Sequence, residues 1–232
     1  MSIDSLGDRI KRYEAVTRNY AVRRMPVVIR VDGKAFHTFT RHSDKPFDQR
    51  IINSMLNAAM DTASNIQGFK VGYVQSDEAT FVLTDYDSLT TNGWFDYNLQ
   101  KMVSISAAMM SVSFIQHYQT DKLPVFDSRA FNVPKEDIIN VLLWRAKDWE
   151  RNSLQMYSSS FFSHKELHGK KRADKHEMLH GIGKNWATDI PTQHTNGTFI
   201  LRTEDGIISR DDILPDYIDI KNAVYPLIDV GD

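Results

Sequence analysis

The sequence contains no cysteine among its 232 residues, which excludes disulfide bonds and thiolate metal sites. It also lacks a run of about 18 apolar residues, the length that a membrane-spanning helix needs. Neither sign of charge dominates, because 28 Lys and Arg stand against 30 Asp and Glu for a net charge of −2. A nucleic-acid surface would therefore have to be a local basic patch. Residues 1–8 lack a basic stretch followed by an apolar one, so we expect no signal peptide and a cytoplasmic location.

Apolar spacing predicts alternating strands and helices over the first 133 residues of a chain long enough to bury a sizeable core. We expect strands at 27–31, 69–74, 79–84 and 123–133, and helices at 48–65 and 98–118. This βαββαβ order is typical of an α+β, ferredoxin-like sheet with helices on one face. We predict a palm-like catalytic domain at 1–134, including an amphipathic helix within 4–24. Residues 135–232 are expected to pack on it as a helical and β extension, with a helix over 138–149 and strands near 197–202.

Two acidic side chains end neighbouring elements of this predicted sheet. Asp32 follows the first strand, and Asp77 lies at the tip of the hairpin. A lone Asp-Gly pair often only caps a turn. In the βαββαβ order, however, the hairpin tip can lie beside the end of the first strand, so we expect the two carboxylates to be adjacent. Such an all-oxygen site suits Mg²⁺, and two ions about 4 Å apart would activate an attacking oxygen and stabilise a leaving pyrophosphate.

The segment after Asp32 has the composition of a phosphate-binding loop. Gly33 permits close backbone approach, and residues 34–37 offer successive N–H groups to phosphate oxygens. Lys45 and Ser76 could add a charge and a hydroxyl group. Strand alternation places Arg30 on the same face as Asp32. Each residue alone could be a turn residue or a solvated charge, but together they indicate metal-dependent nucleotide chemistry.

Several motifs together resemble the tRNA-His guanylyltransferase family. They are IRVDGKAFHTF at 29–39, KPFD at 45–48, QSDE at 75–78, FDSR at 126–129, WR at 144–145 with Asp148, and Lys175. In order along the chain they span residues from about 4 to 190. The resemblance implies a homotetrameric reverse polymerase, a dimer of dimers. It adds nucleotides to the 5′ end of tRNA in the 3′→5′ direction, using two Mg²⁺ ions, with ATP and GTP or other NTPs as substrates.

The resemblance also implies roles for individual residues. Catalysis is assigned to Asp32, Asp77 and Glu78, and metal binding to Asp32, Gly33 and Asp77. Nucleotide binding is assigned to Asp32, Gly33, Lys34, Ala35, Phe36, His37, Lys45, Ser76 and Asp77. We expect 5′-end activation or tRNA binding to involve Arg30, Arg145, Asn152, Lys165, Lys170, Lys171, Arg172 and Lys175. Of these, Lys175 matches a family lysine implicated in 5′-end activation.

One departure from the family pattern bears on the choice of reaction. Eukaryotic members that add guanylate to tRNA-His carry His-Ile-Asn-Asn soon after the Trp-Arg pair. Here the stretch is Glu150, Arg151, Asn152 and Ser153, which retains the asparagine but replaces the histidine. This pattern is similar to the bacterial and archaeal "like" branch, whose members prefer templated repair of 5′-truncated tRNAs. We therefore favour templated 5′-end repair, with guanylate addition to tRNA-His as the close variant.

The basic segment at 164–185 supports competing hypotheses. HEMLH at 176–180 satisfies the zinc-protease pattern, but Trp186 stands where a third histidine would be expected. We favour a basic surface helix that faces water or RNA. Three alternatives remain open at this point: a nucleotide cyclase on a similar palm, a non-catalytic tRNA-binding module, and a zinc protease.

Overall fold

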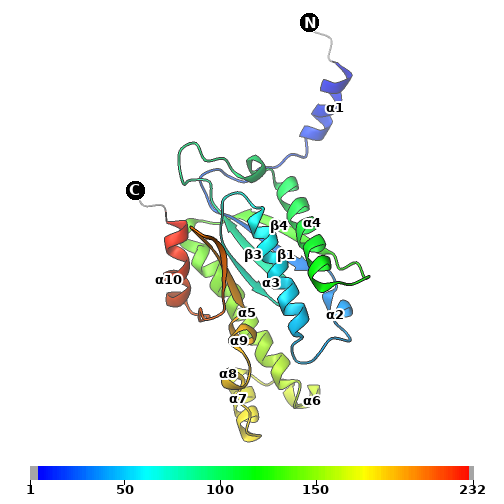
Figure 1. Cartoon of the computed structure of the whole chain (residues 1–232), viewed down its shortest axis with the longest axis vertical. Helices are drawn as coiled ribbons and strands as arrows, with labels where there is room; N and C mark the ends of the chain where they lie inside the picture. Colours follow the sequence, from blue (N-terminus) through cyan, green and yellow to red (C-terminus); the bar gives the residue numbers. More distant parts are fainter. Residues whose placement is uncertain (1–4, 230–232) are drawn as a thin grey trace.

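The computed structural model describes residues 5–229, which form one six-stranded antiparallel sheet covered by helices (Figure 1). The strands are β1 (Val27–Gly33), β2 (Phe69–Gln75), β3 (Glu78–Leu83), β4 (Phe126–Asn132), β5 (Thr198–Thr203) and β6 (Gly206–Arg210). Their order is β4-β1-β3-β2-β5-β6. The first four strands have the predicted ferredoxin-like arrangement, and the α+β fold is confirmed.

Helices cover both faces of the complete sheet. The main ones are α3 (Gln49–Ser64), α4 (Leu99–Tyr118), α5 (Ile138–Ser158) and α10 (Tyr217–Ile228). Val27, Ile29 and Val31 point to the face that α3 and α4 cover, as predicted for the two palm helices. Val28 points to the opposite face, where it packs with apolar side chains of α5 and α10. Arg30 and Asp32 share this second face, because side chains alternate along a strand.

The part of the chain after residue 134 continues the same sheet. Its strand β5 pairs with the edge of β2, with Val74 opposite Thr198, and β6 then pairs with β5. The strands expected near 197–202 coincide with β5, whereas β6 lies beyond that range. Helix α5 extends to Ser158, beyond the predicted periodicity that ended at Trp149, because Leu154 and Tyr157 bury their side chains in a further apolar cluster.

The remaining helices are shorter. They are α1 (Leu6–Ala15), α2 (Phe36–Phe39), α6 (His164–Leu167), α7 (Arg172–Gly181), α8 (Trp186–Asp189), α9 (Thr192–Asn196), and the 3-10 helices η1 (Trp94–Tyr97) and η2 (Lys135–Asp137). Helix α1 extends away from the sheet and buries none of its residues (Figure 1). It occupies only part of the predicted range 4–24, of which residue 4 lies outside the described residues.

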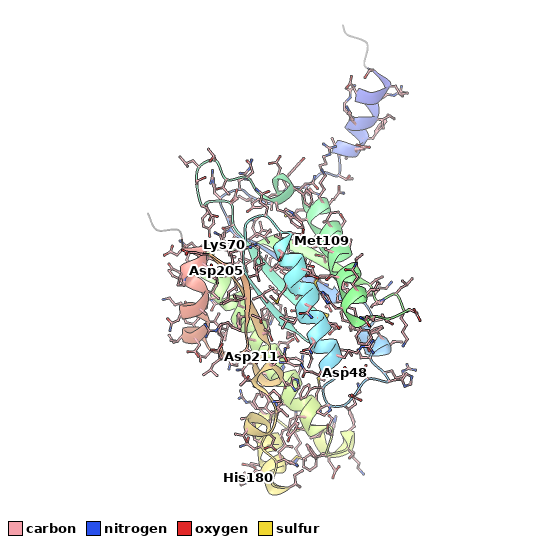
Figure 2. The ribbon with its side chains drawn as sticks, viewed as in Figure 1. Asp48, Lys70, Met109, His180, Asp205 and Asp211 are labelled. Carbon is pink, nitrogen blue, oxygen red and sulfur yellow. The ribbon has the colours of Figure 1, made fainter. Side chains whose placement is uncertain are left out.

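Helices α6, α7 and α8 form a small lobe at the end of the molecule opposite α1, with His180 near its tip (Figures 1 and 2). Its core contains Leu154, Tyr157, Leu179 and Trp186. Within the described residues, no helix is both long and apolar enough to cross a membrane. Residues 1–4, part of the stretch considered for a signal peptide, and residues 230–232 of the predicted extension lie outside the described residues.

Candidate active site

The end of β1 meets the hairpin tip, as the predicted topology requires. The Gly33 amide donates to the Asp77 carbonyl at 3.0 Å, which joins the two segments directly. Asp32 lies opposite Glu78 on β3. Ser76 has a left-handed backbone (φ +49°), which produces the tight turn between β2 and β3. The structure therefore brings Asp32 and Asp77 together, although 44 residues separate them along the chain.

The two aspartates have little internal compensation for their charge. Burial raises the pKa of the Asp77 carboxyl group, and the nearby Asp32 raises it further, while a hydrogen bond from Ser76 opposes the shift. The Ser76 hydroxyl donates to Asp77 Oδ1 at 3.0 Å. Across residues 5–229, no Lys or Arg forms an ion pair with either aspartate. A bound cation would supply the missing positive charge.

The predicted phosphate-binding loop turns sharply directly after Asp32. A Cβ atom on Gly33 would lie 2.3 Å from the Phe36 ring, so a larger residue does not fit without a shift. Ala35 has a left-handed backbone and begins α2, whose first amides have no acceptor within the helix. Phe36 is buried against Phe114 and Phe126 and anchors the loop.

Not every predicted loop group is free to bind a ligand. The Lys34 amide donates to the Val125 carbonyl at 2.9 Å, although the Lys34 side chain is exposed. His37 is exposed beside it. Lys45 is exposed and lines a small cavity of about 80 Å³ together with Ser76 and residues of α5. Asp48 of the KPFD motif caps α3, since its carboxylate accepts from the amides of Arg50 and Ile51. It lies at the start of that helix (Figure 2).

Glu78 is committed to a buried ion pair. Arg145 Nε donates to one oxygen at 2.6 Å and its terminal nitrogen to the other at 2.8 Å. Burial raises the pKa of Glu78, and Arg145 opposes this shift. Arg145 also donates to Asp148 at 3.0 Å. The structure therefore places Glu78 beside Asp32 on the same face of the sheet, where its ion pair with Arg145 joins β3 to α5. Arg145 is only 7% exposed, so it offers RNA little surface.

Two further side chains on this face were not among the predicted site residues. Asp127 on β4 lies directly opposite Asp32, so it points to the same face. Trp144 on α5 is 54% exposed and lies over the guanidinium groups of Arg30 and Arg145. Both lie in the recognised motifs FDSR and WR, but their proximity to Asp32 depends on strand register and helix placement. Motif spacing alone does not supply that information.

The remaining predicted residues lie on α5 and in the lobe rather than beside the aspartates. Asn152 is exposed on α5, and Lys165, Lys170 and Lys171 are exposed on or near α6 and α7. Arg172 donates to Glu150 at 2.7 Å, and Lys175 is half-buried on α7. These residues form a basic surface separate from the carboxylate pair.

The HEMLH segment does not form a metal site. Burial lowers the pKa of His176, and its ring packs 5.9 Å from that of Trp186. His180 points into solvent. In the part of the chain that the structure describes, no group of three or more His, Cys, Asp or Glu side chains is placed to hold a metal ion. The geometry therefore gives the zinc-protease hypothesis no support.

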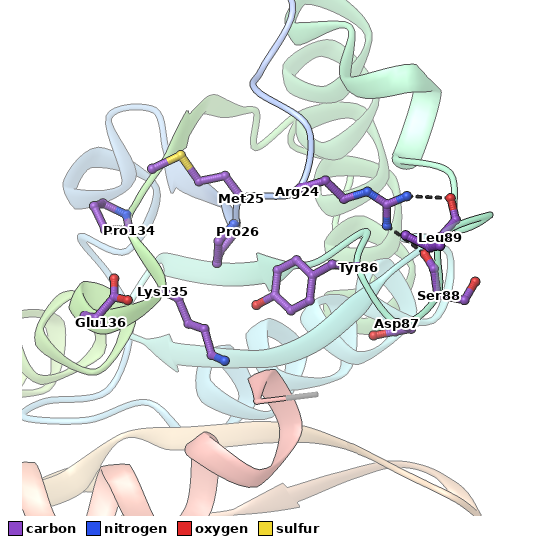
Figure 3. Close-up of a pocket in the computed structure, with 10 residues that line it drawn as sticks. All are labelled: Arg24, Met25, Pro26, Tyr86, Asp87, Ser88, Leu89, Pro134, Lys135 and Glu136. Atoms are coloured by element: carbon purple, nitrogen blue, oxygen red, sulfur yellow. Dashed lines mark hydrogen bonds between the residues drawn. The ribbon is translucent and has the colours of Figure 1, made fainter. Parts of the chain in front are cut away.

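A separate cavity of about 850 Å³ lies at the opposite ends of the same strands (Figure 3). Its basic side chains are already engaged. Arg24 donates to the carbonyl groups of Asp85, Ser88 and Leu89, and Lys135 pairs with Asp229. This cavity is distinct from the candidate active site.

Comparison with known proteins identifies the family. The family model described as tRNAHis guanylyltransferase matches residues 7–134. The tRNA(His) guanylyltransferase of Schizosaccharomyces pombe is 30% identical over 205 residues, covering 78% of this chain and 75% of that protein. The solved structure of a bacterial tRNA(His) guanylyltransferase-like protein in complex with ATP is 34% identical, with a TM-score of 0.90, and covers 98% of this chain and 100% of that chain.

A more distant structure shares the fold. The crystal structure of the Saccharomyces cerevisiae tRNA(His) guanylyltransferase has a TM-score of 0.75 at 22% identity, covering 89% of this chain and 96% of that chain. These findings confirm the resemblance drawn from the sequence motifs and the predicted enzyme class. The chain therefore belongs to the tRNAHis guanylyltransferase family and is a nucleotidyltransferase.

Proposed function

We propose that this enzyme adds nucleotides in the 3′→5′ direction to the 5′ end of tRNA, copying the opposite strand to repair truncated ends. Guanylate addition to tRNA-His is the close variant. The observation that carries the proposal is the meeting of Asp32 and Asp77 beside the loop at 33–37. The replacement of the eukaryotic histidine by Glu150 favours repair, and Glu150 here accepts hydrogen bonds from Lys147 and Arg172.

The donor set fits Mg²⁺. Asp32 and Asp77 provide carboxylate oxygens and Gly33 a backbone carbonyl, and the raised pKa of Asp77 marks a charge that its own surroundings leave undercompensated. We propose that these three residues hold two ions. When bound, Mg²⁺ supplies Lewis-acid activation of the attacking oxygen and stabilises charge on the leaving phosphates.

Nucleoside triphosphates are the proposed small substrates. Related bacterial proteins have been solved in complex with ATP and with GTP. In this chain, the first amides of α2 and the Ser76 hydroxyl lie beside the aspartates, and the exposed Lys45 ammonium lines the adjoining cavity. These groups would orient a triphosphate by hydrogen bonds and charge.

The proposed chemistry has two steps. The 5′-monophosphate of the tRNA first attacks the α-phosphorus of ATP or GTP, and pyrophosphate leaves. The 3′-hydroxyl of an incoming NTP then attacks the activated 5′ phosphorus, and the activating group leaves. The pairing of the incoming base with the opposite strand selects the nucleotide. Positioning by the loop and the basic side chains is this chain's main contribution to the rate.

The tRNA would contact the basic surface of the lobe. Lys165, Lys170 and Lys171 are exposed there, and Asn152 lies on the adjoining stretch of α5. Contacts of this kind hold phosphates and carry no base specificity. We further propose that 135–232 contributes this RNA surface to a palm at 1–134, and that the enzyme acts as a homotetramer in the cytoplasm.

The test uses a tRNA that lacks its first 5′ nucleotide, with NTPs and Mg²⁺. We expect 5′ extension by the wild type, its loss in Asp32→Ala and Asp77→Ala, and its retention in Asp205→Ala. Asp205 is a matched control, because it is an exposed aspartate in the turn between β5 and β6 (Figure 2). Cyclic nucleotide formation without RNA would favour a cyclase instead. RNA binding without extension would favour a binding module.

A further inference from the structure

Trp144 is a large aromatic side chain left exposed beside the catalytic carboxylates. It lies on α5 with 54% of its surface exposed. Leaving an indole in water forgoes the gain from burying its apolar surface. Two guanidinium groups hold the ring in place: that of Arg145 lies 4.5 Å and that of Arg30 lies 5.4 Å from the ring centroid. The side chain is therefore a supported aromatic surface that faces solvent.

Arg145 keeps this surface rigid. It is buried, and its Nε and one terminal nitrogen donate to Glu78 and Asp148. A guanidinium with its donors engaged still presents its flat face to an aromatic ring. The ring is thus held by an ion pair that is itself anchored to β3, the strand that begins at the hairpin tip.

Arg30 differs from Arg145 because its donors have no hydrogen-bond partner in the described chain, although only 17% of its side chain is exposed. In the described chain it makes no hydrogen bond, its Nε is buried without a partner, and its sole ion pair is Glu78 at 4.0 Å. Its neighbour on the adjacent strand β4, Arg129, is half-exposed and pairs with Asp127 through one terminal nitrogen at 3.0 Å, which leaves its other donors available. Trp144 is thus accompanied by two guanidinium groups that can meet phosphate oxygens.

Trp144 and Arg30 lie near the proposed catalytic aspartates. Arg30 precedes Asp32 by two residues on the same face of β1, about 7 Å along the strand. The loop at 33–37 follows Asp32 in the other direction. A base stacked on Trp144 would therefore approach the aspartates from the side opposite to the phosphate-binding loop.

We propose that Trp144 is a stacking platform for an unpaired or terminal base of the RNA substrate, with Arg30 and Arg129 contacting its phosphates. This inference rests on the proposed function and adds a positioning residue to it. RNA is favoured over a free nucleotide because α5 continues from Trp144 to Asn152 and the basic lobe, which gives one strand a continuous path. Stacking on an aromatic ring is tolerant of sequence, which suits an enzyme that repairs varied 5′ ends.

The test follows the stacking directly with a fluorescent base. An acceptor-stem RNA carries 2-aminopurine as its 5′-terminal nucleotide and is titrated with protein in the absence of NTPs. We expect quenching by the wild type and by Trp144→Phe, which retains an aromatic face. Trp144→Ala should lose most of the quenching and bind about tenfold more weakly. Tyr217→Ala, which removes an exposed aromatic from α10, should behave as wild type.

Turnover measurements distinguish a loss of substrate positioning from misfolding of the variant. In Trp144→Ala we expect the KM for RNA to rise about tenfold while kcat stays within about twofold, whereas a damaged fold would lower both kcat and the melting temperature. Equal quenching and affinity in Trp144→Ala would overturn the inference. So would quenching of 2-aminopurine riboside triphosphate without RNA, which would assign the platform to the free nucleotide. A change of oligomeric state that explains the lost affinity would assign Trp144 to a subunit interface.

The inference and the proposed function can fail separately. If the wild type extends tRNA and Trp144→Ala does so with the same KM, only the stacking role fails. If the wild type extends no RNA, the proposed function fails, whatever the fluorescence shows.

Discussion

Replacing Arg145 by methionine would leave the Glu78 carboxylate buried without its partner. Both carboxylate oxygens accept hydrogen bonds from Arg145, at 2.6 and 2.8 Å, and both side chains are about nine-tenths buried. Removing one member of such a pair costs about 3–5 kcal/mol, because the remaining charge keeps its desolvation penalty. For a chain of this length, we expect the melting temperature to fall by about 6–20 °C.

Urea denaturation followed by circular dichroism measures this loss, and Arg129→Met is the matched control. Arg129 pairs with Asp127 at 3.0 Å, but both side chains are half-exposed, so its removal should cost under about 1 kcal/mol. The double variant Glu78→Gln/Arg145→Met should recover much of the stability. Arg145→Met with unchanged stability and a raised KM for tRNA would refute this reasoning and assign Arg145 to RNA binding.

Three further predictions concern the loop, the aspartates and the lobe. Because the folded protein raises the pKa of Asp77 above its ordinary 3.8, ionised Asp77 costs stability once the pH exceeds that value. Asp77→Asn should therefore raise the melting temperature of the metal-free protein at pH 7. Thermal melts should show that this gain disappears below pH 3.8, and an equal gain at every pH would contradict the prediction. Gly33→Ala should lower both the rate of 5′ extension and the stability of the protein. Gly181→Ala, where a Cβ would meet open space, should change neither. An unaltered extension rate in Gly33→Ala would contradict the tight packing of this loop. Charge reversal at Lys170, Lys171 and Arg172 should raise the Kd for tRNA in filter binding and leave nucleotide binding unchanged, and equal tRNA affinity at low salt would exclude this surface.

The sequence predicts the fold well where apolar periodicity decides it. Strand β1 alternates between two cores, and α3 begins at a recognisable cap, Asp48. The pairing of β5 with β2 was not predicted, because an edge pairing depends on which strand edges remain open after folding. The true length of α5 was missed for a similar reason, since contacts with the lobe stabilise its last turns.

The candidate site, like the fold, is only partly predictable from the sequence. The adjacency of Asp32 and Asp77 follows from strand order, which the sequence pattern contains. The commitment of Glu78 to Arg145 does not, because these residues are 67 positions apart and meet only through the placement of α5 on the sheet. Asp127 and Trp144 join the site through register and helix packing, which motifs do not encode.

The most direct test of the central role of the aspartates is a single-turnover measurement of 5′ addition. A tRNA that lacks its first nucleotide but already carries a 5′-triphosphate removes the activation step from the measurement. With saturating NTP and Mg²⁺, we predict that the wild type adds the complement of the opposite base, and that Asp77→Asn is slower by at least about a hundredfold. Addition by Asp77→Asn at the wild-type rate would contradict the assignment of catalysis to this carboxylate pair.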